Sequence, residues 1–219
     1  MMDNTALMTR YARLLGFPEL LLLRICLVLC LLALSGCVTL PAGTGLNAPI
    51  HSENALPRKA WIGTVKIADD SVKNRPVVED SLRGNIMTYL QEGGYFLETS
   101  SLPGKVAADD LVLDFRFDHY IQKRTPHPAY FPLALVTMTF YIWFGGPIFV
   151  DESSLSGVLE IHNGSGKSIG NVISQLHEEH NVSLWSPEYA LPSGIKARTS
   201  LIQELISKAS TDIRNKLTQ

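Results

Sequence analysis

The sequence predicts a single small α+β domain, with a mixed or antiparallel sheet and two helices packed on one face of it, in the order β-α-β-β-β-β-α. Several stretches between residues 59 and 185 alternate apolar with polar residues, as half-buried strands do. Two longer stretches repeat apolar residues at helical spacing. With 219 residues, 46% of them hydrophobic, the chain is long enough to bury one substantial core.

The first half of the domain begins with a strand. Trp61 to Ile67 alternates, and the pattern puts Trp61, Val65 and Ile67 on one side of it. A helix is expected from Pro76, because Pro suits a first turn, and Gly93-Gly94 is expected to end it. Its apolar positions are Val78, Leu82, Ile86, Tyr89 and Leu90. Tyr95 to Glu98 is a short second strand.

The second half adds three strands and a helix. Leu111 to Ile121 alternates, and its expected core residues are Leu111, Leu113, Phe115, Phe117 and Ile121. Leu155 to Ile161 and Ser168 to Trp185 flank a turn-forming stretch, which predicts a hairpin. The last helix is expected to begin at an N-cap, Ser193. Its apolar stripe is Ile195, Ile202, Leu205, Ile206, Ala209, Ile213 and Leu217.

Composition and motif spacing argue against several kinds of ligand. The formal net charge is −2, with no basic patch for nucleic acid. Gly164 to Ser168 shares letters with a phosphate-binding loop, but Ile161 occupies the place of its first Gly, so we expect no nucleotide. His177 and His180 are three residues apart on an expected strand, where their side chains point to opposite faces. We therefore predict no metal and no cofactor.

Catalysis has one candidate pair. Asp114 and Asp118 share a strand face with Arg116, and paired carboxylates can do acid-base work. An envelope hydrolase is thus an alternative function. Charged side chains alternating in sign are more typical of a solvated strand face, and no nucleophile motif accompanies them. We predict that the protein is not an enzyme.

An apolar insert extends from residue 129 to residue 150 without a charge. Pro132 and Gly145-Gly146-Pro147 interrupt it, which leaves the twelve residues from Leu133 to Phe144. A bilayer-spanning helix needs about 20 residues, so twelve suit a core or interfacial segment. The insert is predicted either to fill the domain's own core or to contact a membrane or a partner. The candidate contact residues are Phe140, Tyr141, Trp143 and Phe144.

The N-terminal part predicts export and lipidation. Ile25 to Leu34 is uncharged and follows three arginines, as in a signal peptide. Leu34-Ser35-Gly36-Cys37 resembles the bacterial lipobox, L-[AS]-[GA]-C. The resemblance implies cleavage between Gly36 and Cys37, and acylation of Cys37 on its thiol and its new amino group. It also implies the outer membrane, facing the periplasm, because Val38 replaces the Asp that signals inner-membrane retention.

These observations divide the chain into a signal peptide at 1–36, a flexible tether at 37–58 rich in Pro and Gly, and a periplasmic domain at 59–219. The order of elements in the domain resembles the TolB N-terminal domain and related envelope lipoproteins. We expect a non-catalytic lipoprotein, held on the membrane through acylated Cys37, that docks onto or supports another envelope protein. A component of an oligomeric secretion or envelope-assembly complex is the other alternative.

Overall fold

The computed structural model describes residues 38–39, 43–52, 55–137, 140–189 and 194–217. Cys37, Gly36 and the rest of the predicted signal peptide therefore lie outside the described residues. So does Ser193, the predicted N-cap of the last helix.

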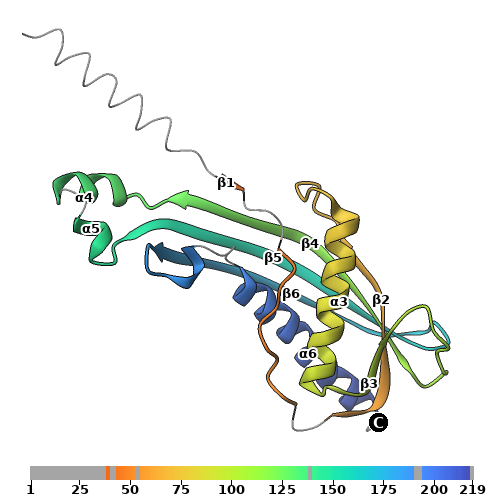
Figure 1. The fold of residues 1–219 in the computed structure, drawn as a ribbon. Helices are drawn as coiled ribbons and strands as arrows, with labels where there is room; N and C mark the ends of the chain where they lie inside the picture. The colour runs from red at the N-terminus through yellow and green to blue at the C-terminus, as the bar shows by residue number, and fades with distance from the viewer. Residues whose placement is uncertain (1–37, 40–42, 53–54, 138–139, 190–193, 218–219) are drawn as a thin grey trace, which may run out of the picture. The chain divides into compact units, whose positions relative to one another are not determined.

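A mixed sheet forms the centre of the domain (Figure 1). Its main path has the order β3-β2-β4-β5-β6, and β1 pairs with β4 off this path. β2 is parallel to β3 and β4, whereas β4-β5 and β5-β6 are antiparallel. The strands are β1 (Val38–Thr39), β2 (Leu56–Ile67), β3 (Phe96–Ser101), β4 (Leu111–Pro126), β5 (Pro147–Asn163) and β6 (Ser168–Ser183).

Two long helices, α3 (Arg75–Gly93) and α6 (Ile195–Leu217), cover one face of this sheet (Figure 1). α3 packs against β2 and β3, and α6 packs against β5 and β6. The predicted fold class, with two helices on one face, is confirmed. Gly94 ends α3 as predicted: it adopts φ +62°, and its N–H donates to the carbonyl of Gln91.

The core lies between the helices and the sheet. It contains most of the apolar positions expected from the sequence, and the largest fully buried side chains are Leu56, Ile62, Leu82, Ile86, Leu90, Leu111, Leu113, Phe115, Phe117, Leu155, Leu159 and Ile161. Both α3 and α6 bury their apolar faces against the same face of the sheet, which explains why both helices lie on one side of it.

β-Bulges in two strands change which residues face the core. β4 contains one extra residue between Phe117 and His119, so the side-chain alternation reverses there. Tyr120 is buried instead of the predicted Ile121. β2 contains another extra residue between Ile62 and Val65. The core side of β2 before this bulge holds Ala60 and Ile62, so the predicted placement of Trp61 beside Val65 and Ile67 was wrong.

Residues 43–52, here called the strap, run between α3 and α6 (Figure 1). Their carbonyls accept hydrogen bonds from Tyr120 Oη at 2.6 Å, Asn85 Nδ2 at 2.8 Å and Arg198 Nε at 3.2 Å. Asn47 donates its N–H to Thr199 Oγ1 at 2.9 Å. This part of the predicted flexible tether is therefore packed onto the domain. Likewise, β2 begins at Leu56, inside the predicted tether.

Candidate functional site

The site with the strongest claim to a function is the segment that connects β4 to β5. Two short helices, α4 (Tyr130–Val136) and α5 (Phe140–Trp143), lie at the end of the long β4-β5 hairpin (Figure 1). Neither helix contains a buried residue. We define the apolar tip by the exposed side chains of this region: Leu133, Leu135, Val136, Phe140, Trp143, Phe144 and, from the segment after β6, Trp185.

The tip is exposed to an extent that is unusual for large apolar side chains. Phe140 is 62% exposed, Trp143 is 65% exposed and Phe144 is 87% exposed. The alternative that these three residues fill the domain's own core was therefore wrong. Exposed apolar side chains gathered in one region are typical of contact surfaces, so the tip is the candidate contact surface of this domain.

Tyr141, the fourth candidate contact residue, has a different position. It is only partly exposed, and its hydroxyl donates to the carbonyl of Pro147 at 3.3 Å. Its ring lies against Gly146, where an added Cβ would come within 2.4 Å of the ring. Tyr141 thus holds the turn into β5 in place. Thr137 joins the two helices, since Thr137 Oγ1 donates to the carbonyl of Leu133 and accepts from the N–H of Tyr141.

Trp185 joins the tip from a distant part of the sequence. Its Nε1–H donates to the carbonyl of Trp143 at 3.3 Å, and the two indole rings have centroids 6.0 Å apart. Sequence reasoning assigned Trp185 only to the end of a strand. A tryptophan among small and turn-forming residues was the available signal, but the pairing of β5 with β6 was needed to place it beside the insert.

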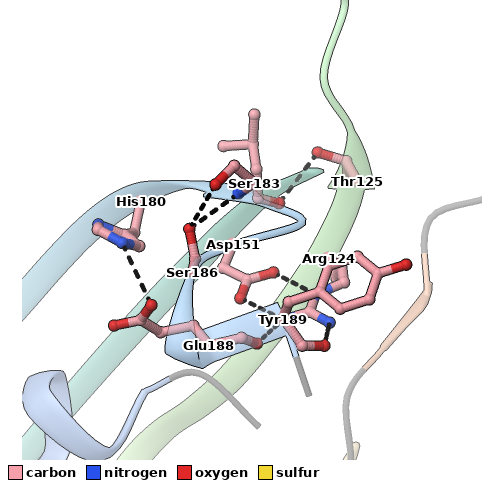
Figure 2. Close-up of polar contacts among 9 residues, drawn as sticks. Arg124, Thr125, Asp151, His180, Ser183, Ser186, Glu188 and Tyr189 are labelled. Carbon is pink, nitrogen blue, oxygen red and sulfur yellow. Dashed lines mark hydrogen bonds and ion pairs between the residues drawn. The ribbon is translucent and has the colours of Figure 1, made fainter. Parts of the chain in front are cut away.

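A buried ion pair fixes the base of the tip (Figure 2). Arg124 Nε and Nη2 bind Asp151 Oδ1 and Oδ2 at 2.6 and 2.8 Å, a bidentate arrangement. Asp151 is only 2% exposed. Arg124 also donates from Nη2 to the carbonyl of Glu188 and from Nη1 to that of Tyr189. The hydrogen bond to Asp151 raises the pKa of Arg124 further above its usual range, so the guanidinium stays charged.

Further contacts tie the segment after β6 to the hairpin. The Arg124 guanidinium lies 5.4 Å from the centre of the Phe149 ring, which in turn contacts Tyr189. Figure 2 shows Ser186 Oγ accepting the N–H of Ser183 at 3.0 Å. Because these contacts hold residues 183–189 against β4 and β5, Trp185 has a fixed place at the tip.

A polar cavity of about 290 Å³ lies beside this ion pair. Its lining includes Asp151, Glu178, Glu179, His180, Glu188 and Lys196. His180 Nε2 lies 4.0 Å from a carboxylate oxygen of Glu188, whereas His177 pairs with Glu179. Within the described part of the chain, no group of three or more His, Cys, Asp or Glu side chains is arranged to hold a metal ion.

Asp114 and Asp118 do not form a catalytic pair with each other. Asp114 Oδ1 accepts hydrogen bonds from the N–H and the hydroxyl of Thr64 at 2.6 and 2.7 Å. Asp114 thereby binds the backbone N–H of a residue in the bulge of β2. Asp118 pairs with Arg116 at 3.0 Å. Each carboxylate thus has a local partner on its own strand or on the neighbouring strand.

β1 brings the N-terminal end of the domain to the base of the tip. Val38 pairs with Arg124 and Thr39 with Lys123, in antiparallel register. β4 runs toward the tip, so the chain enters β1 from the side of the tip. In the described residues, no helix has the length and apolar character needed to cross a membrane.

Comparisons with known proteins bear on the fold. No family model matches the chain, and no curated protein matches it. Protein XCC0632 from Xanthomonas campestris, of family DUF330, has a similar structure at a TM-score of 0.50 and 7% identity, over 80% of this chain and 97% of that one. At this identity the similarity shows a shared fold only.

Two further solved structures are less similar. A minor lipoprotein from Acinetobacter baumannii has a TM-score of 0.36 and 12% identity, over 74% of this chain and 95% of its own. The PelC dodecamer from Paraburkholderia phytofirmans has a TM-score of 0.35 and 13% identity, over 81% of this chain and 95% of its own. Similarity at this level carries no functional conclusion.

Proposed function

We propose that this protein is a non-catalytic lipoprotein of the cell envelope, anchored by acylated Cys37 and making its main external contact through the apolar tip. The exposure of Phe140, Trp143 and Phe144 at the end of the hairpin carries this proposal. A domain with a well-filled core of its own has no internal need for such a surface.

The anchor rests on the sequence Leu34-Ser35-Gly36-Cys37. One acyl chain binds a membrane weakly, whereas two or more hold a protein on it stably, at about 0.8 kcal/mol per buried methylene. The outer membrane, with the domain in the periplasm, is the proposed location because Val38 follows the cysteine. The lack of a converging carboxylate pair at Asp114 and Asp118 supports a role without catalysis.

Metabolic labelling with palmitate tests the anchor. We expect the wild-type chain to incorporate label and Cys37→Ser to incorporate none and to remain unprocessed. Cys26→Ser, which changes a cysteine within the predicted signal peptide, is the matched control and is expected to label normally. Labelling that persists in Cys37→Ser would contradict the proposal.

Photo-crosslinking in cells tests the contact surface. A photoreactive residue at Phe144 is expected to give an adduct with lipid or with a protein. The same residue at Ile173, which is also apolar and 58% exposed but lies on β6 opposite Val158, is the control and is expected to give none. Equal yields of adduct at both positions would show that the tip is not the contact.

A further inference from the structure

The polarity of the hairpin changes in steps along its length. The end carries exposed aliphatic and phenyl side chains, including Val136 at 80% and Phe144 at 87%. The Trp143-Trp185 pair follows, and then Phe149 with Tyr189. Among the described residues, the charged groups that follow are the Arg124–Asp151 pair, Glu188, Lys123 and Glu152. Membrane proteins show the same order: apolar side chains lie in the bilayer interior, Trp and Tyr lie at the interface, and charged side chains lie in water.

The register of β1 relates this gradient to the lipid anchor. Val38 pairs with Arg124, and α4 begins at Tyr130, six residues further along the chain. Extended chain rises about 3.3 Å per residue, so about 20 Å of chain at most separates the level of Val38 from the start of α4. Cys37 is bonded directly to Val38, at a Cα separation of about 3.8 Å. β1, which directly follows Cys37 in the chain, therefore pairs with the part of β4 that leads to the apolar tip.

β1 and the strap are both held on the domain by hydrogen bonds. A long flexible tether would leave the tip free to face any direction. Instead β1 pairs with β4, and residues 43–47 are hydrogen-bonded to Asn85, Arg198 and Thr199. With Cys37 held in a membrane, the tip would therefore lie close to that membrane.

We infer that the apolar tip inserts into the interfacial layer of the same bilayer leaflet that holds the acyl chains of Cys37, giving the protein a second membrane contact. This inference rests on the proposed lipid anchor. α4 and α5 have seven and four residues, too few to span the membrane, so they lie in its surface layer. The partner of the tip is the acyl and headgroup boundary of the bilayer, not a protein groove.

Fluorescence quenching by brominated lipids tests the inference with the acylated full-length product. The chain has three tryptophans, of which Trp143 and Trp185 belong to the tip, whereas Trp61 lies on β2 and donates to Asp110. The protein is reconstituted into phosphatidylethanolamine and phosphatidylglycerol vesicles with bromines near the headgroup end of the acyl chains. We expect strong quenching in the wild type and loss of most of it in Trp143→Phe/Trp185→Phe, where only Trp61 remains.

Two variants make this result specific to the tip. Adding Ile173→Trp to the double variant places an exposed indole on β6, and we expect it to stay unquenched. Phe144→Asp puts a charge at a position that is 87% exposed, so the fold is retained, and we expect it to reduce the quenching of Trp143. Near-ultraviolet circular dichroism of each variant checks that the domain is folded.

The outcomes separate the inference from the proposed function. Mass spectrometry of the N-terminal peptide reports acylation of Cys37 independently of fluorescence, and an unmodified Cys37 would overturn the anchor. Acylated protein whose wild-type quenching equals that of the double variant would overturn the membrane contact alone. In that case a protein adduct from Phe144 in cells would assign the tip to a partner.

Discussion

At the scale of single residues, the Arg124–Asp151 pair determines whether the base of the tip stays in place. Asp151 is nearly fully buried, and Arg124 uses its remaining donors on the carbonyls of Glu188 and Tyr189. Removing one partner of such a pair leaves an uncompensated buried charge. The pair therefore links the ends of two strands to the segment that carries Trp185.

We predict that Asp151→Asn destabilises the protein by about 3 kcal/mol, because Arg124 then has no counter-ion. Urea unfolding measures the change. Asp118→Asn is the matched control: Asp118 pairs with Arg116 on an exposed face, and its loss is expected to change stability by less than about 0.5 kcal/mol. Equal effects of the two substitutions would show that the buried pair has no special role.

Asp69 gives a second prediction at this scale. Burial favours the neutral carboxyl, but hydrogen bonds from Ser71 and from the N–H of Tyr120 outweigh it and lower the pKa of Asp69 below its usual 3.8. The unfolded chain therefore takes up the proton first on acidification. The stability that Asp69 contributes is complete above about pH 5 and is lost as the pH falls through 3.8 and below.

Asp69→Asn is accordingly expected to lower stability at pH 7 by about 2 kcal/mol and to flatten the loss of stability between pH 5 and pH 3. Urea unfolding at a series of pH values measures both effects. The neighbouring Asp70→Asn changes a carboxylate that is 90% exposed and should leave the pH profile close to that of the wild type. A wild-type slope retained in Asp69→Asn would contradict the assignment.

At the scale of elements, the hydroxyl of Thr199 joins the strap to α6. The N–H of Asn47 donates to Thr199 Oγ1, and that hydroxyl also donates to the carbonyl of Ile195. Thr199→Val keeps the shape but removes the acceptor. We predict that the amide of Asn47 then exchanges with deuterium about fivefold faster, equivalent to about 1 kcal/mol.

The amide of Ser52 provides the internal control for this measurement, because it donates to the carbonyl of Gly93 and does not touch Thr199. Its exchange should not change. Faster exchange at both amides would mean that the whole strap has detached, and no change at Asn47 would mean that Thr199 does not hold it.

The elements also show which parts of the fold the sequence could predict. Apolar spacing located α3 and α6 correctly, and Gly93-Gly94 located the end of α3, because both signals are local properties of the sequence. The predicted faces of β2 and β4 were partly wrong, because each strand contains a bulge, between Ile62 and Val65 in β2 and at Asp118 in β4. A bulge reverses the alternation and leaves no distinct mark in the sequence. Likewise, the Pro and Gly of the strap suggested flexibility, whereas its hydrogen bonds come from distant residues such as Asn85 and Thr199.

At the scale of the whole molecule, the sequence predicted the apolar insert of the candidate site but not the residues around it. The absence of charge identified the insert, and three of its four aromatic candidates are exposed. Its position at the end of a hairpin, the arrival of Trp185 and the pairing of β1 beside Arg124 all depend on strand order. A periodicity argument cannot supply the last two contacts, since each joins residues more than 40 positions apart in the sequence.

The length of β5 limits how far the far end of the domain can lie from the apolar tip. β5 has 17 residues, which at about 3.3 Å each gives roughly 56 Å from its start at Pro147, beside the tip, to its end at Asn163. With the tip seated in the bilayer, the turn at Gly164–Lys167 stands no more than about that height above the membrane. A soluble component that contacts the far end of the domain must therefore come within this distance of the lipid surface.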